Sequence, residues 1–160
     1  MRDTWSETDT AHMRTALGKA SEALAAGEVP VGAIVVVAGR IAGRGHNQSI
    51  RSCDPSAHAE IIALREAAKS LGNYRLSDAT AYVTLEPCPM CIGAMLHARI
   101  RRLVFGAYDP RAGAAGSVLD LCGDRRFNHR IEVNGGLLAE ECGELLRGFF
   151  EARRATPHSA

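Results

Sequence analysis

The sequence predicts an α/β layered domain built on a mixed sheet. Segments with helical periodicity alternate with short β-rich runs along the chain, which is the pattern of helices covering a sheet. The first two β-rich runs are joined by a short turn, as in an antiparallel hairpin, whereas helices separate later ones, as in parallel crossovers. Because 160 residues are the size of one domain, we expect a single domain over 1–160 with an ordered core at about 8–154.

The composition disfavours several other classes of protein. Hydrophobic residues make up 46% and charged residues 23% of the chain, close to the average of globular domains, so disorder and fibrous repeats are not expected. The longest apolar run, 29–39, is about half as long as a membrane-spanning helix, and the start of the chain is polar where a secretory signal is apolar. We therefore expect a cytoplasmic protein with no membrane partner. A net charge of +1 neither requires nor excludes a nucleic acid.

The first elements are a helix and a hairpin. Apolar residues recur every three or four positions over 8–26, which predicts an amphipathic helix ended by Gly27. The two β-rich runs that follow predict a hairpin whose second strand delivers His46 and Asn47 at its end.

A second helix is predicted to start near Asp54, with Asp54 or Ser56 as its cap, and to stop at Gly72. His58 and Glu60 then fall in its first turn. The rest of the chain continues the alternation. The expected elements are a strand at 80–85, a helix at 92–99, strands at 102–106 and 129–133, a turn at 134–136 and a closing helix at 137–154.

Two cysteines mark a candidate metal site. Cys88 and Cys91 lie one helical turn apart at the start of a predicted helix, so their thiols share a face. A helix N-terminus stabilises thiolates, the form that binds zinc. His58, at the start of the other helix, is the candidate third ligand, and Glu60 follows it. The resulting pattern, H-x-E and then P-C-x-x-C after positions 61–86, is typical of zinc nucleobase deaminases.

Three protein ligands would leave the fourth tetrahedral position of zinc to water, as in catalytic sites. Such a zinc lowers the pKa of its water to about 7, and Glu60, which is not a ligand, can then move protons. Two alternatives stay open. Cys53 could close a structural zinc site with three cysteines and His58 in a binding module, or the two cysteines could be a redox or merely buried pair. Cys122 and Cys142 are interpreted as ordinary thiols.

The sequence resembles the bacterial tRNA-specific adenosine deaminases over roughly residues 10–154. The resemblance is carried by "EVPVGAIVV", "GHNQSI", "DPSAHAEIIALREAA", "NYRLSDATAYVTLEPCPMCIGAMLHARIRRLVFGAYDPRAGAAGS", "NHRIEV", "GGLLAEEC" and "LLRGFFEARR". It implies a three-layer α/β/α, cytidine-deaminase-like fold, and hydrolytic deamination of the wobble adenosine of a tRNA anticodon to inosine by a zinc-activated hydroxide. It also implies one zinc ion per subunit, no nucleotide cofactor, a tRNA anticodon stem-loop as partner, and a homodimer in which both subunits touch the tRNA.

The resemblance also implies roles for single residues. His58, Cys88 and Cys91 are expected to bind zinc, and Glu60 is expected to shuttle protons. Asn47 matches the family position that hydrogen-bonds the target nucleoside, although Asn is also common in the turn after a strand. The positions that match residues facing the anticodon loop are Asn128, His129, Phe150, Arg153 and Arg154. For these five, packed residues and a solvated basic helix end are the alternative.

The zinc motif alone fits several deaminases, so an enzyme acting on a free base or nucleoside, of guanine or cytosine type, is the alternative function. A guanine deaminase would carry an aromatic pair near Leu96 and His97, which is absent. The sequence departs from the adenosine deaminases at His46 and Tyr108, where flanking nucleotides can be held differently, and the segment 121–126 is also unlike these relatives.

Overall fold

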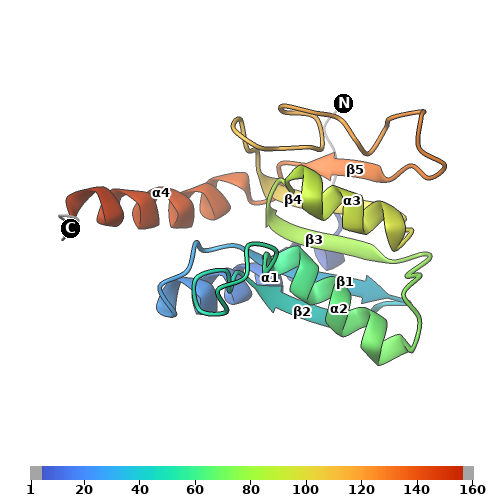
Figure 1. Ribbon diagram of the computed structural model, residues 1–160, viewed down its shortest axis with the longest axis horizontal. Helices are drawn as coiled ribbons and strands as arrows, with labels where there is room; N and C mark the ends of the chain where they lie inside the picture. The colour runs from blue at the N-terminus through green and yellow to red at the C-terminus, as the bar shows by residue number, and fades with distance from the viewer. Residues whose placement is uncertain (1–4, 157–160) are drawn as a thin grey trace.

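The computed structural model describes residues 5–156 and shows an α/β fold of three layers (Figure 1), which confirms the predicted fold class. Its elements are α1 (Glu7–Ala25), β1 (Gly32–Val37), β2 (Arg40–His46), α2 (Ala59–Leu71), β3 (Thr80–Leu85), α3 (Pro89–His97), β4 (Arg102–Ala107), β5 (Glu132–Gly135) and α4 (Ala139–Ala155). None of the helices within residues 5–156 combines the length and the apolar character that a membrane crossing requires. The expected single domain over 1–160 includes 1–4 and 157–160, which lie outside the described residues, and it stays a prediction.

The strands form one mixed sheet in the order β2-β1-β3-β4-β5. β1 pairs antiparallel with both β2 and β3, whereas β3, β4 and β5 run parallel. The hairpin turns at Ala38 and Gly39, which both have positive φ, as the tight turns of hairpins require. Because β3 and β4 are parallel neighbours, the segments that follow them emerge side by side at one end of the sheet.

Helices cover both faces of the sheet. α2 and α3 lie on the face turned toward the viewer in Figure 1, here called the front face, and α1 lies behind the sheet, on the rear face. α4 starts against β3 and β4 on the rear face and then extends past the sheet. One apolar cluster fills the space between the sheet and α2 and α3, and a second lies between the sheet and α1 and α4.

α2 lies directly on β2 because β2 contains two inward-facing glycines. A Cβ atom at Gly43 would overlap the carbonyl oxygen of Ala63, and one at Gly45 would overlap that of Ala59. Glycine is therefore the one residue that permits this approach. The close contact places the first turn of α2 beside the end of β2, so residues after β2 meet residues that begin α2.

A buried polar network joins α1 to the sheet on the rear face. The carboxylate of Asp9 accepts hydrogen bonds from the Tyr82 hydroxyl and from Arg102 Nη1, each at 2.8 Å. Arg102 also donates from Nε to Asn134 Oδ1 at 2.8 Å. Burial alone would raise the pKa of Asp9, but the hydrogen bonds from Arg102 and Tyr82 outweigh burial and hold this pKa at about 2.

The predicted start of α2 is wrong. The helix begins at Ala59, with His58 as its N-cap residue, instead of near Asp54. The carboxylate of Asp54 closes a separate turn, because it accepts hydrogen bonds from Ser56 N (2.8 Å) and Ser56 Oγ (2.7 Å). His58 therefore stands just outside the helix, while Glu60 lies in its first turn.

Two other boundaries also differ from the prediction. α3 begins at Pro89 rather than at residue 92, because proline fits the first helical position, where its missing N–H has no partner to lose. β5 covers Glu132–Gly135 rather than 129–133, since the residues before it follow a separate course in which His129 Nε2 bonds the Ile100 carbonyl at 2.7 Å. The turn predicted at 134–136 is wrong in part, because Asn134 and Gly135 belong to β5. The remaining helices and strands match their predictions within one or two residues.

Candidate metal centre and adjoining cleft

The three predicted metal ligands meet where α2 and α3 begin. His58 is the N-cap residue of α2, Cys88 is the N-cap residue of α3, and Cys91 lies in the first turn of α3. Their donor atoms all lie within 4.8 Å of one another. Among residues 5–156, no other group of three or more His, Cys, Asp and Glu side chains is close enough to hold a metal ion.

The geometry of this group fits zinc. His58 Nδ1 lies 3.6 Å from Cys88 Sγ and 3.5 Å from Cys91 Sγ. A tetrahedral zinc ion, with sulfur at about 2.3 Å and nitrogen at about 2.0 Å, separates these atoms by about 3.6 Å. Two thiolates and an imidazole are also ligands that zinc prefers. The set leaves one tetrahedral position without a protein ligand.

Hydrogen bonds within the group favour a thiolate at Cys88. The pKa of Cys88 is lowered to about 4, mainly by a hydrogen bond from Cys91 and also by His58, while burial opposes the change. The contact between the two cysteines raises the pKa of Cys91. The separate contact between His58 and Cys88 raises the pKa of His58 against the effect of burial. Groups this close share protons that a metal ion displaces when it binds.

Glu60 is buried next to the metal ligands. It lies in the first turn of α2 with 5% of its surface exposed. Burial raises the pKa of Glu60, and hydrogen bonds to its own backbone N–H and to Cys91 oppose this in part. The carboxyl group thus contacts a ligand without belonging to the donor group, which is the arrangement that a proton carrier at a metal site needs.

Asn47 braces the start of α2. Its Oδ1 accepts a hydrogen bond from the N–H of Ala59 at 2.8 Å, one of the N–H groups that a helix N-terminus leaves free. Because a backbone N–H can donate only to the oxygen of a side-chain amide, this contact fixes which terminal atom of Asn47 is Oδ1 and which is Nδ2. The Nδ2 group therefore remains a donor, and Asn47 can serve both the helix and a ligand.

Cys53 does not join the metal centre. It is exposed, has positive φ, and its Sγ faces the Ile50 carbonyl oxygen at 3.7 Å. It lies outside the group of donor atoms, so a structural zinc with four protein ligands has no support within residues 5–156. Cys122 and Cys142 are buried in the two apolar clusters, as ordinary packed thiols are.

A cleft of about 450 Å³ lies between α4 and the loop after β4. Its lining includes Val29, Leu85, Tyr108, Arg111, Phe150 and Arg154. Leu85 ends β3, three residues before Cys88 in the sequence, although none of the three metal ligands is among the residues that line the cleft. Tyr108 and Phe150 expose 59% and 44% of their surfaces, and exposed aromatic rings beside arginines are typical of sites for single-stranded RNA.

The two arginines at the end of α4 have different surroundings. The guanidinium of Arg153 lies over the ring of Phe149, 4.8 Å from its centroid, and donates a hydrogen bond to the Gly27 carbonyl at 3.4 Å. Arg154 lines the cleft together with Phe150. Two of the three α4 residues expected to face RNA thus line the cleft, and the third packs on its own chain.

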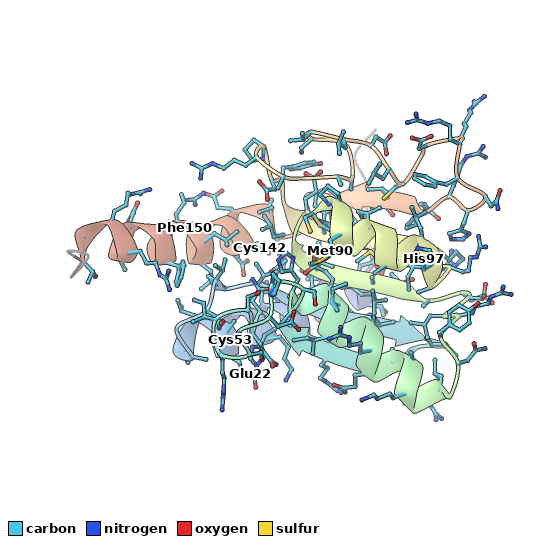
Figure 2. All side chains as sticks on the ribbon, in the orientation of Figure 1. Glu22, Cys53, Met90, His97, Cys142 and Phe150 are labelled. Carbon is cyan, nitrogen blue, oxygen red and sulfur yellow. The ribbon has the colours of Figure 1, made fainter. Side chains whose placement is uncertain are left out.

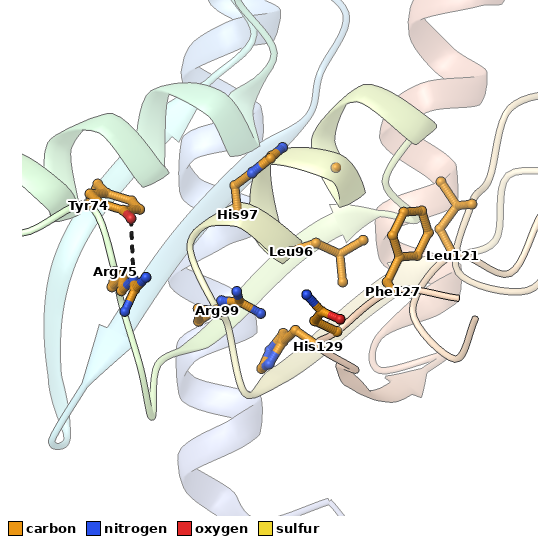
Figure 3. Close-up of a pocket in the computed structure, with 10 residues that line it drawn as sticks. Tyr74, Arg75, Leu96, His97, Arg99, Leu121, Phe127 and His129 are labelled. Carbon is orange, nitrogen blue, oxygen red and sulfur yellow. Dashed lines mark hydrogen bonds between the residues drawn. The ribbon is translucent and has the colours of Figure 1, made fainter. Parts of the chain in front are cut away.

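The other two residues expected to contact RNA lie elsewhere. Asn128 and His129 border a hollow of about 310 Å³ near the far end of α3, together with Phe127 (Figure 3). Figure 2 places His97, at that end of α3, and Phe150, on α4, toward opposite sides of the molecule. Four of the five predicted RNA residues are therefore divided between two surfaces, and Arg153 lines neither.

Two buried carboxylates near the site were missed by the sequence analysis. Glu28 accepts hydrogen bonds from the N–H groups of Ile50 (2.7 Å) and Arg51 (3.1 Å), which hold the loop after Asn47. Glu86 accepts hydrogen bonds from the backbone of the loop after β4. In the sequence, each glutamate lies next to an apolar run, and a carboxylate that is buried with such a run needs hydrogen-bond partners. This position in the sequence was the signal that could have identified the two residues.

The sequence matches known proteins over most of its length. Residues 6–107 match the cytidine and deoxycytidylate deaminase zinc-binding region. The chain is similar to the tRNA-specific adenosine deaminase of Haemophilus influenzae, with 56% identity over 150 residues that cover 93% of this chain and 87% of the relative.

Two solved structures are also similar. One comes from biochemical and structural studies of A-to-I editing by tRNA:A34 deaminases at the wobble position of transfer RNA, and it matches with a TM-score of 0.83 and 43% identity over 86% of this chain and 99% of that chain. The other is the guanine deaminase from Nitrosomonas europaea, with a TM-score of 0.75 and 28% identity over 92% of this chain and 86% of that chain. The TM-score and the sequence identity are both higher for the tRNA:A34 deaminase structure.

Proposed function

The chain belongs to the tRNA-specific adenosine deaminases, which carry the zinc-binding region of the cytidine and deoxycytidylate deaminases, and we propose that it converts the wobble adenosine of a tRNA anticodon to inosine. The observation that carries this proposal is the 56% identity to the Haemophilus influenzae relative over 87% of that protein. The metal centre and the cleft beside it add the chemistry and the surface that the reaction needs. We also propose that residues 1–160 act as one deaminase domain.

His58, Cys88 and Cys91 would hold one zinc ion per subunit, and that ion would supply Lewis-acid activation of a water molecule. Glu60 carries the protons. Its carboxylate takes a proton from the water and delivers it to N1 of the adenine ring as the water oxygen bonds to C6. The carboxylate then takes the remaining proton from that oxygen and gives it to the amino group, so that the C6–N bond breaks. Water is consumed, ammonia leaves and inosine remains. Because Glu60 is buried, its protons pass to the substrate rather than to bulk solvent.

Asn47 and the cleft position the substrate. With Oδ1 engaged by the backbone of α2, the Nδ2 group of Asn47 donates to the target nucleoside. The rings of Tyr108 and Phe150 offer surfaces on which bases that flank the target adenosine can stack. Arg111 and Arg154 would bind phosphates of the same RNA. An anticodon loop suits this site because its bases are already unpaired.

Deamination of free guanine is the second candidate, favoured by the similarity to the guanine deaminase from Nitrosomonas europaea. Two observations weigh against it. The identity to that enzyme is 28%, half of the 56% to the adenosine deaminase. Leu96 and His97 also stand where a guanine deaminase is expected to carry an aromatic pair.

The test compares RNA with free substrates. The purified protein is incubated with an anticodon stem-loop that carries adenosine at the wobble position, with a matched stem-loop that carries adenosine only elsewhere in the loop, and with free adenosine, cytidine and guanine. We expect inosine only in the first RNA. Product from a free base or nucleoside alone would keep the zinc chemistry and contradict the tRNA assignment.

The protein is further proposed to act as a cytoplasmic homodimer in which tRNA touches both subunits. The division of the predicted RNA residues supports this, because Phe150 and Arg154 line the cleft while Asn128 and His129 border a separate hollow. A second subunit would bring its hollow to the RNA held in the cleft of the first. All five cysteines are free, as is usual in the cytoplasm.

Light scattering measures the dimer, and mixing of variants tests its role. Glu60→Gln lacks the proton carrier, and Asn128→Ala lacks a residue proposed to act on the RNA of the partner. A mixed dimer would unite an intact Glu60 with an intact Asn128 from the other subunit, so the mixture should be more active than either variant alone. A monomeric protein, or a mixture no better than its components, would contradict the proposal.

A further inference from the structure

We propose that Glu86 is a positioning residue: its buried carboxylate holds the loop 108–117, which forms one wall of the cleft, against the metal-binding turn. The nature of the substrate that this wall grips rests on the proposed function. The contact between Glu86 and the loop stands on the structure alone.

The loop 108–117 is organised around this one carboxylate. Oε1 accepts a hydrogen bond from the N–H of Asp109 at 3.1 Å, and Oε2 accepts from the N–H groups of Ala115 (3.0 Å) and Ser117 (3.1 Å). The hydroxyl of Ser117 also donates to Oε1. The beginning and the end of the loop are thus tied to a side chain that is 1% exposed.

Further contacts join the loop to the metal-binding turn. The N–H of Glu86 donates to the Ala107 carbonyl, and the N–H of Ala114 donates to the Pro87 carbonyl, each at 2.8 Å. Gly113 lies so close to the Glu86 carboxylate that a Cβ atom there would overlap it. The loop and the residues just before Cys88 therefore form one packed unit.

This unit links the wall of the cleft to the metal centre. Tyr108, Asp109 and Arg111 line the cleft, and Cys88 follows Glu86 by two residues. Because all the partners of the carboxylate are N–H or O–H donors, a side-chain amide in its place would set one donor against another and leave a buried group unpaired. A carboxylate is therefore what keeps the cleft wall in a fixed position against the metal-binding turn.

Hydrogen exchange tests whether Glu86 holds the loop, whichever substrate the enzyme uses. In Glu86→Gln, the amides of Asp109, Ala115 and Ser117 should exchange at least about tenfold faster than in the wild type, with unchanged zinc content. Asp9→Asn is the matched control, because it makes the same acid-to-amide change at a buried carboxyl group on the rear face, and it should leave these amides unchanged. Unchanged exchange in Glu86→Gln would overturn the proposal.

Kinetics tests whether the loop position matters for the substrate. Glu86→Gln should raise KM for the anticodon stem-loop about tenfold and lower kcat less. Glu86→Asp keeps the carboxylate and should recover part of the change, and Asp9→Asn should leave KM unaltered. A normal KM in Glu86→Gln would overturn the positioning role. A wild-type protein that makes no inosine would refute the proposed function, and the exchange measurement would still decide whether Glu86 holds the loop.

Gly113→Ala disturbs the same contact from the side of the loop, and it serves as the second variant if Glu86→Gln does not fold. It should speed exchange at the same amides and raise KM. Combined with Glu86→Gln, its effects should not add, because both changes break one contact. Full addition of the two effects would mean independent contacts and would contradict the proposal.

Discussion

Buried carboxyl groups lie on both faces of the sheet, but their partners differ in kind. On the rear face, Asp9 accepts hydrogen bonds from Arg102 and Tyr82, which belong to the sheet itself. On the front face, Glu60 lies beside the metal ligands, and just past the end of β3, Glu86 accepts hydrogen bonds from backbone N–H groups of a loop that lines a cleft. Asp9 is satisfied by side chains of the sheet, whereas Glu60 contacts the metal-ligand group and Glu86 is satisfied by the wall of the cleft.

The difference teaches that burial and a shifted pKa do not identify a site by themselves. The pKa of Asp9 is lowered to about 2, and its hydrogen-bond partners account for the change. A shift of this size would also suit an active-site residue. The front face differs because two thiols and an imidazole lie close together there, at the N-termini of two helices. Changes at the metal ligands should therefore lower metal content and activity together, changes at Glu60 or in the cleft should alter activity alone, and a change at Asp9 should alter stability.

Cys88→Ser should have the largest effect, because it removes a metal ligand from the front face. A serine hydroxyl ionises far less readily than a thiol, so it is a poor zinc ligand. Zinc content and activity should fall together, the activity to the background of the assay. Metal analysis and the stem-loop assay on the same preparation check this. A full complement of zinc in the variant would contradict the ligand assignment.

Glu60→Gln should lower kcat by roughly 10²- to 10⁴-fold, because the amide cannot carry protons. It should leave zinc content and unfolding temperature close to those of the wild type, since the amide has the same shape and Glu60 is outside the donor group. Single-turnover assays, metal analysis and thermal unfolding check these expectations. Near-normal turnover would exclude Glu60 as the proton carrier.

Arg154→Ala and Arg153→Ala compare an arginine that lines the cleft with a neighbouring arginine of α4 that packs on the protein itself. Arg154 lines the cleft, so its loss should raise KM for the stem-loop roughly three- to tenfold and weaken the dependence of KM on salt. Arg153 packs on Phe149, so its loss should change KM less and lower the unfolding temperature more. Equal effects of the two variants on KM would show that both arginines face the RNA.

Asp9→Asn should leave activity unchanged and lower stability at neutral pH by about 2 kcal/mol. The pKa of Asp9 in the folded protein, about 2, lies below its ordinary value of 3.8. The carboxylate therefore stabilises the fold fully above about pH 4, and this contribution is lost as the pH falls through about 2. Denaturant unfolding over this range should show the two proteins converging toward low pH. A constant difference would mean that the titration of Asp9 is not linked to folding.

Much of the fold could be predicted because its signals are local. The hairpin, β3, β4 and α1 carry their own apolar periodicity and bounding residues. The start of α2 could not be predicted in this way, because Asp54 is a good helix cap by type but its carboxylate is taken up by Ser56. The bounds of β5 depend on its pairing with β4, which no local pattern records.

The candidate site also has one part that local sequence signals predict and another part that depends on long-range contacts. The spacing of Cys88 and Cys91 on a helix and the residue types of His58 and Glu60 state their chemistry directly in the sequence. The role of Glu86 is invisible there, because its partners are backbone N–H groups more than twenty residues away. The separation of the predicted RNA residues into two surfaces likewise appears only once the helices are placed.

The outer strands of the sheet restrict how copies of this chain can associate. β2 carries exposed Arg40 and Arg44 along one edge, and β5, at the other edge, has four residues and begins with exposed Glu132. Charged or short edge strands resist pairing with a second sheet. Edge-to-edge aggregation is thereby disfavoured, and two subunits that associate would join through helices and loops rather than by continuing the sheet.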